Sequence, residues 1–172
     1  MRVPLGILFS TLLLASCATA PGKPSVTAMT ELNPTQGNSV SGTVKFSAAG
    51  DRVRVEAEIN GLKPGQHGFH IHDKGDCSAP DGTSAGGHFN PKGKPHNSHV
   101  GSERHGGDLG NLMADSNGKA TLSLEVSDVS IGTGADGIVG RSVIVHADPD
   151  DYKTQPSGNS GKRIACGVIV LK

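Results

Sequence analysis

Histidine side chains are concentrated in one part of the chain. Seven of the eight histidines lie between positions 67 and 105, and the eighth, His146, ends an apolar run. His70 and His72 stand two residues apart in a stretch whose alternation suits a β-strand, so both imidazoles should lie on one face. Each histidine taken singly is more often an ordinary surface or core residue. Gathered in this way, they predict a metal site, because zinc and copper accept imidazole nitrogen.

A long segment rich in glycine and proline carries further ligand types. It runs from Lys74 to Gly107 and shows no strand or helix period. Such a loop normally counts against a compact domain, unless metal and disulfide restraints order it. The remaining candidate ligands follow one another at steps of eight, nine and three residues: His88, His96, His105 and Asp108.

Composition favours a single all-β domain. The 172 residues include 25 glycines and only 3% aromatic side chains, so the core must be built from Val, Ile, Leu and Ala with many turns. With 16 basic and 16 acidic residues the formal charge is zero, which argues against nucleic acid or a membrane surface as a general partner.

Strand patterns recur along the chain and no helical pattern does. Alternating residues predict a half-buried hairpin from 40–46 and 53–59, and Ser116-Asn117-Gly118 predicts a turn across which 109–113 and 120–126 pair. Seven or eight short strands imply a β-sandwich or barrel. The other predicted strands are 26–32, the strand that carries His70 and His72, 143–146 and 164–171.

Residues 1–16 predict an export signal. Arg2 precedes an apolar run that is too short to span a bilayer. The run ends in Leu14-Ala15-Ser16-Cys17, which resembles a bacterial lipoprotein processing site, where cleavage exposes Cys17 for attachment of a diacylglyceryl group. An ordinary signal peptide cleaved at Ala18 or Ala20 is the alternative.

The rest of the chain then divides into a lipidated tether, residues 17–25, and a folded domain, residues 26–172. With Cys17 assigned to lipid, Cys77 and Cys166 remain as one pair in an exported protein and should form a disulfide.

Four segments together resemble one family. They are Gly68-Phe69-His70-Ile71-His72, then Ser84-Ala85-Gly86-Gly87-His88-Phe89-Asn90-Pro91, then Gly107-Asp108-Leu109, then Gly161-Lys162-Arg163-Ile164-Ala165-Cys166-Gly167-Val168. In this order they are similar to copper/zinc superoxide dismutase, and the match runs from about Val26 to the last residue. The resemblance implies an eight-strand Greek-key β-barrel with long metal-binding and electrostatic loops.

The resemblance also implies two metal sites. Copper would be bound by His70, His72, His88 and His146, and zinc by His88, His96, His105 and Asp108. His88 would bridge the two metals, which an imidazole can do only as an imidazolate. Zinc with four protein ligands would be structural.

The activity implied is the dismutation of superoxide to dioxygen and hydrogen peroxide by alternate reduction and reoxidation of copper. His88 would supply a proton and Arg163 would stand at the copper channel. Asp150 would join a copper histidine to a zinc histidine, with the adjacent Asp151 as the alternative. His67 is expected to be structural, and His99 could compete with His96 for zinc.

A second hypothesis is an exported copper- or zinc-buffering protein without turnover. The presence of every expected ligand and of Arg163 favours the enzyme. The partners implied are the superoxide anion, a membrane reached through the lipid on Cys17, and a second copy of the chain, with monomer or dimer left open. The expected location is the periplasmic or cell-surface side of a bacterial membrane.

Overall fold

Antiparallel strands build almost the whole structure. The computed structural model describes residues 26–172, so the predicted signal, the tether and Cys17 lie outside the described residues. One short 3₁₀ helix, η1 (Thr83–Ala85), is the only helical element of residues 26–172. The strands are β1 (Thr27–Pro34), β2 (Ser41–Ala49), β3 (Arg52–Asn60), β4 (Gly65–His72), β5 (Asp108–Ala114), β6 (Ala120–Val126), β7 (Ser142–His146), β8 (Arg163–Val168) and β9 (Val170–Leu171).

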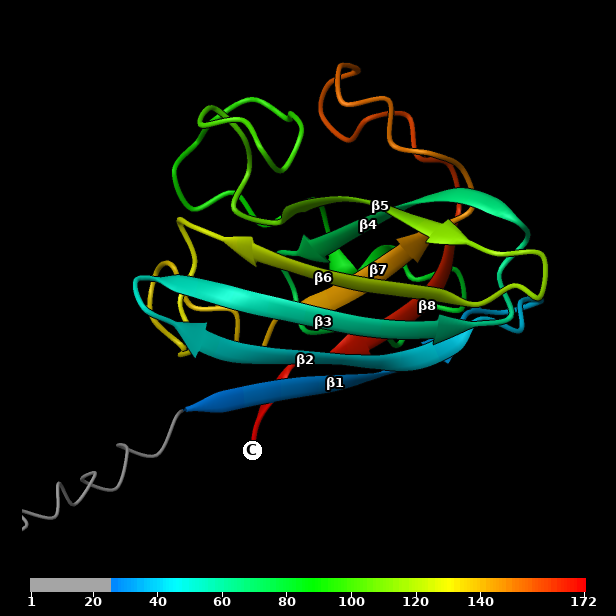
Figure 1. Cartoon of the computed structure of the whole chain (residues 1–172), viewed down its shortest axis with the longest axis horizontal. Coiled ribbons are helices and arrows are strands. Elements are labelled where there is room, and N and C mark those ends of the chain that lie inside the picture. Colours follow the sequence, from blue (N-terminus) through cyan, green and yellow to red (C-terminus); the bar gives the residue numbers. More distant parts are fainter. Residues whose placement is uncertain (1–25) are drawn as a thin grey trace, which may run out of the picture.

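Eight of the strands form a nearly closed barrel in the order β5-β4-β7-β8-β1-β2-β3-β6, and β9 pairs with β1. In Figure 1 the strands β1, β2, β3 and β6 form one layer in front of β4, β7 and β8. The connections from β3 to β4 and from β6 to β7 cross between these layers, which gives Greek-key topology. The all-β barrel prediction is confirmed. Across residues 26–172, we find no helix with the length and apolar character of a membrane span.

The core follows the period-two pattern of the strands. On β3 every second residue is buried, and Val55 pairs with Phe46 of β2 in the predicted hairpin. The alternate residues of β3 face solvent, where Arg54 pairs with Glu125 at 2.7 Å. Burial of the inward faces therefore sets the register, because a one-residue slip would expose the whole apolar set.

The predicted pairing of 109–113 with 120–126 is wrong. The turn between them forms, and the Asp115 carboxylate accepts hydrogen bonds from the N–H groups of Asn117 and Lys119. Beyond the turn the strands separate, since β5 pairs with β4 and β6 pairs with β3. A turn sequence reverses the chain, but the free edges of β3 and β4 decide where the strands find hydrogen-bond partners. The predicted strand 164–171 is likewise interrupted at Ile169, where the chain passes from β8 to β9.

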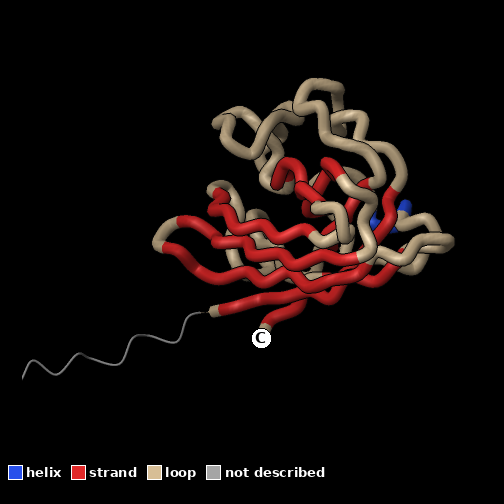
Figure 2. The backbone as a smooth tube through the Cα atoms, turned by 45° about the vertical axis from the view of Figure 1, so that its right-hand side comes forward, coloured by secondary structure: helices blue, strands red, loops and turns tan. Residues whose placement is uncertain are grey.

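Two long connections gather at one end of the barrel. We call residues 73–107 the long loop and residues 147–162 the polar loop. Figure 1 shows the polar loop and the later part of the long loop above β4 and β5, and Figure 2 shows most of the loop backbone collected on that side. The long loop is bound to β4 by backbone hydrogen bonds, from Phe89 N–H to Ile71 O at 2.8 Å and from Ile71 N–H to Gly107 O at 2.9 Å. These loops cover the outer face of β4.

Candidate metal centre

Strand β4 presents two different faces. Phe69 and Ile71 point into the barrel core, whereas His70 and His72 lie on the outer face under the two loops. All four side chains are buried. Alternation along one strand therefore supplies a pair of imidazoles in a site that the barrel makes rigid and the loops shield from water.

Two further histidines complete the first group. His146 comes from the end of β7, the neighbour of β4, and His88 comes from the long loop, where it forms a β-bridge with His72. One ring nitrogen from each of His70, His72, His88 and His146 lies within 4.8 Å of the others.

The outer ring nitrogens of this group are held by neighbours. His70 Nε2 lies 2.8 Å from Asp150 Oδ2, and His72 Nδ1 lies 2.9 Å from the carbonyl oxygen of Gly86. His146 Nδ1 lies 3.3 Å from the carbonyl oxygen of Gly161. An N–H that donates to an oxygen on the outside leaves the lone pair of the other nitrogen directed inward, which is the arrangement of metal-ligating histidines.

A second group collects around one carboxylate oxygen. Asp108 Oδ1 lies 2.9 Å from Nδ1 of His88, 2.9 Å from Nδ1 of His96 and 3.4 Å from Nδ1 of His105. The other carboxylate oxygen accepts hydrogen bonds from the backbone N–H groups of Asn97 and His105. Three imidazole nitrogens and one carboxylate oxygen that all lie within 4.8 Å of one another match the ligand types of a closed zinc site.

His88 belongs to both groups. Its Nδ1 faces Asp108, while its Nε2 faces the first group and has no hydrogen-bond partner among the described residues. Both nitrogens of one ring are thus directed at two different ligand sets.

Several buried nitrogens lack the partner that a protein interior normally supplies. Four histidine nitrogens of residues 26–172 are buried without a hydrogen bond: His99 Nδ1, which lies outside both groups, and His70 Nδ1, His88 Nε2 and His105 Nδ1. An unpaired buried polar atom costs about 1 to 3 kcal/mol. The nitrogens of His70, His88 and His105 belong to residues of the two groups, so a bound cation in each group accounts for these three. The residues therefore fit copper and zinc.

Electrostatics keep the first group neutral and the carboxylates charged. Burial lowers the pKa of His72 and of His146 well below the usual value, and neighbouring histidines add to the effect. Burial and the nearby His70 lower the pKa of His88 to about 4. Burial would raise the pKa of Asp108, but hydrogen bonds from the histidines outweigh it and hold that pKa far below its ordinary value. Neutral imidazoles and an ionised carboxylate are the forms that bind metal.

Asp150, and not Asp151, contacts the histidines. Its Oδ2 lies 2.8 Å from Nε2 of His70 and its Oδ1 lies 2.9 Å from Nε2 of His96, so one carboxylate joins the two groups. Asp151 is exposed and accepts hydrogen bonds from Lys153 N–H and the Thr154 hydroxyl.

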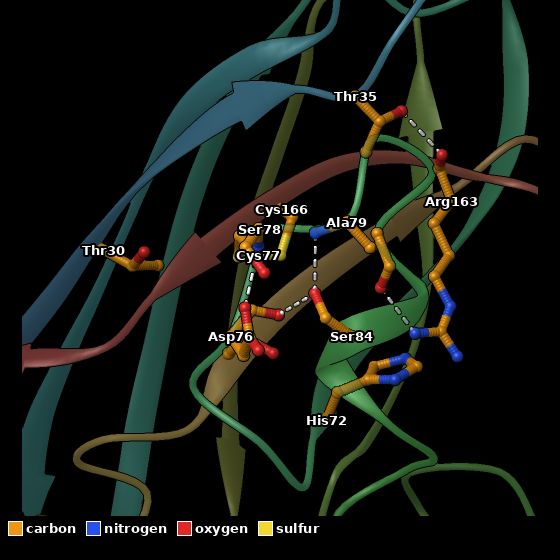
Figure 3. Close-up of a disulfide and its surroundings, with 12 residues drawn as sticks. Thr30, Thr35, His72, Asp76, Cys77, Ser78, Ala79, Ser84, Arg163 and Cys166 are labelled. Carbon is orange, nitrogen blue, oxygen red and sulfur yellow. Dashed lines mark hydrogen bonds between the residues drawn. A yellow bond between two sulfur atoms is a disulfide. The ribbon is translucent and has the colours of Figure 1, made fainter.

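Arg163 lies beside the first group at the edge of the disulfide region (Figure 3). Its guanidinium donates to the carbonyl oxygens of Gly82 and Gly86 at 2.7 and 2.6 Å. The disulfide between Cys77 and Cys166 ties this part of the long loop to β8. Arg163, His72, His88 and His146 all line one cavity of about 490 Å³, which also borders Ser157 of the polar loop.

The two remaining loop and strand histidines lie outside both groups. His67 lies 2.8 Å from the carbonyl oxygens of His146 and Lys63, so its ring joins backbone segments. His99 packs against Gly110, where a Cβ would lie 2.7 Å from its Nδ1. His96, and not His99, therefore belongs to the group that collects around Asp108.

Sequence reasoning missed several groups that support the site. The Gly86 carbonyl accepts from both His72 and Arg163, and buried Arg104 donates to the carbonyl oxygens of His105 and Ser127. Carbonyl oxygens carry no signature in a sequence. The arginine looks like any charged residue of a solvated loop until its burial is known.

The fold and the site define a class: a Greek-key β-barrel metalloprotein with two ligand sets that share one histidine. The chain matches the family described as copper/zinc superoxide dismutase (SODC) over residues 40–169. It is 46% identical over 138 residues to Superoxide dismutase (Cu-Zn) of Paramecium bursaria Chlorella virus 1, covering 76% of this chain and 72% of that protein. The chain belongs to the copper/zinc superoxide dismutase family. It is an enzyme that dismutates superoxide to dioxygen and hydrogen peroxide, with copper and zinc as its metals.

Proposed function

We propose that the two ligand groups divide the metals between them. Copper is held by His70, His72, His88 and His146, and zinc by His88, His96, His105 and Asp108. The assignment is supported by chemistry, since the group with a carboxylate is closed and suits zinc, while the all-histidine group borders the cavity and suits a redox metal that must meet substrate. Copper held by these residues would supply the one-electron chemistry by which one superoxide is oxidised to dioxygen and a second is reduced to hydrogen peroxide.

His88 is the proton carrier in this proposal. The single observation that carries it is the position of the ring, with Nδ1 toward Asp108 and an unpartnered Nε2 toward the first group. While Nδ1 keeps the ring in place, Nε2 can hold a proton at the wall of the cavity. The second superoxide needs two protons to leave as hydrogen peroxide, and His88 supplies one where that product forms.

Arg163 binds and orients the substrate. Its bonds to Gly82 and Gly86 fix the guanidinium plane against the long loop, and its positive charge faces the cavity that contains the histidines. A fixed cation attracts a small anion and holds it by charge-assisted hydrogen bonds. Lys153 and Lys162 on the polar loop add positive charge at longer range.

Metal analysis combined with an activity assay tests this proposal. We expect one copper and one zinc for each chain, together with removal of superoxide. A protein fully loaded with copper that removes no superoxide would instead support the metal-buffering alternative.

We further propose that the enzyme is exported and anchored to the periplasmic or cell-surface side of a bacterial membrane through lipid on Cys17. The pattern of residues 1–17 supports the anchor, and the disulfide between Cys77 and Cys166 fits an oxidising compartment. Cys17→Ala should yield a soluble or an unprocessed form, because the variant lacks the thiol that receives the lipid. If that variant is cleaved and still sediments with membranes, the anchor assignment is wrong. That the protein forms a homodimer is also a prediction. Analytical ultracentrifugation of the domain tests it by measuring the mass of the particle in solution.

A further inference from the structure

The polar loop contacts the backbone of a zinc-group residue through one side chain. Gln155 Oε1 accepts a hydrogen bond from the His96 N–H at 2.8 Å, and Gln155 Nε2 donates to the His96 carbonyl oxygen at 2.8 Å. The amide thus satisfies both backbone groups of one residue. Two residues opposite each other in an antiparallel sheet exchange the same pair of bonds. Among side chains, only an amide offers a donor and an acceptor in this form.

His96 needs such a contact because no strand holds its backbone. It lies in the long loop between irregular residues, 12 positions before Asp108. Its ring is fixed at both nitrogens, since Nδ1 faces Asp108 and Nε2 lies 2.9 Å from Asp150. Without a backbone contact, the ring would have to keep this direction while the main chain beneath it moved.

The polar loop can approach His96 closely because of a glycine. At Gly158 an added Cβ would lie 2.7 Å from His96 Nε2 and would overlap the Asp150 carboxylate. Gly158 also has φ +67°, a conformation that favours glycine. One side of His96 is therefore covered by the backbone of the polar loop, the Asp150 carboxylate and the Gln155 amide.

We propose that Gln155 is a positioning residue for the zinc group, which consists of His88, His96, His105 and Asp108. This proposal rests on the assignment of zinc to that group. By pairing with the His96 backbone, it holds the imidazole so that Nδ1 faces Asp108 before zinc arrives. Gln155 is followed directly by Pro156 and Ser157, which line the cavity beside Arg163. The same amide contact thus places the cavity wall relative to the zinc group, so its loss affects metal retention first and the shape of the cavity second.

The test is the rate of zinc release from the copper- and zinc-loaded protein into excess chromophoric chelator. Gln155→Ala should release zinc about tenfold faster, the lower end of the effects seen when a supporting contact of a metal ligand is removed. Thr154→Ala is the matched control, because its hydroxyl donates to Asp151 and, among residues 26–172, its side chain makes no hydrogen bond with His96. This control should release zinc at nearly the wild-type rate.

Hydrogen exchange at the His96 amide provides a readout that global loosening would not mimic. Exchange should accelerate in Gln155→Ala and stay slow in Thr154→Ala, because only Gln155→Ala removes the acceptor of the His96 N–H. Wild-type zinc release and a protected His96 amide in Gln155→Ala would refute the proposal. Equal acceleration in Thr154→Ala would also refute it, since the effect would then belong to the loop as a whole. A wild-type protein that binds no zinc would overturn the zinc assignment itself.

Discussion

Asp150→Asn should separate the two ligand groups with almost no change of volume. The Asp150 carboxylate accepts three hydrogen bonds: Oδ2 from His70 Nε2 at 2.8 Å, and Oδ1 from His96 Nε2 at 2.9 Å and from Tyr152 N–H at 2.7 Å. Burial alone would raise the pKa of Asp150, but these hydrogen bonds hold the pKa below its ordinary value, so the group is charged at neutral pH.

Asparagine has only one acceptor oxygen. If that oxygen keeps the two bonds with His96 and Tyr152, the side-chain NH₂ faces the His70 Nε2–H and a donor meets a donor. A hydrogen bond to a charged group contributes about 1.5 to 3 kcal/mol. This loss corresponds to about 10- to 150-fold in an equilibrium constant. Because His70 belongs to the group that we propose binds copper, we predict that copper affinity falls by this factor and that zinc affinity falls less.

Competition with a copper chelator of known affinity, at about pH 7, measures the effect. Asp151→Asn is the control, because Asp151 is exposed and contacts only its own loop. We expect copper affinity in this control to equal that of the wild type. Unchanged copper affinity in Asp150→Asn, or an equal fall in Asp151→Asn, would refute the reasoning.

His96→Ala should lower zinc affinity more than about tenfold, whereas His99→Ala should leave it unchanged. Equilibrium dialysis measures both affinities. Loss of zinc in His99→Ala alone would show that His99, and not His96, is the ligand. Arg163→Ala should slow turnover strongly and weaken its dependence on salt, whereas Arg163→Lys keeps part of the rate, as pulse radiolysis measures. An unchanged rate and salt dependence in Arg163→Ala would contradict its role. Burial disfavours charge on His96, yet hydrogen bonds with two carboxylates outweigh it and raise the pKa of His96 to about 9. If His96 binds zinc as proposed, zinc must displace this proton, so apparent zinc affinity should rise about tenfold per pH unit between about pH 7 and 9. An apparent zinc affinity that does not change over this pH range would contradict the prediction.

Local patterns in the sequence predicted an all-β sandwich or barrel and the residue types of the site. Period-two alternation is a property of a single strand, so it showed that His70 and His72 share a face and that Val55 points inward. Ligand chemistry is likewise local, because an imidazole or a carboxylate accepts a metal wherever it lies. For the same reason the hairpin of β2 and β3 followed from sequence, whereas the pairing of β5 and β6 across an equally good turn did not.

Only the tertiary structure decided which of several equivalent groups meet. His96 and His99 are three residues apart, Asp150 and Asp151 are adjacent, and their types do not distinguish them. Which histidine and which aspartate meet depends on where the polar loop contacts the long loop. That contact brings Asp150 and Gln155 next to His96, although they lie 54 and 59 positions away from it in the sequence. Such contacts form when the barrel and the disulfide bring both loops to the same end. The sequence by itself determined the chemistry available to this enzyme, and the closure of the barrel determined which atoms share a site.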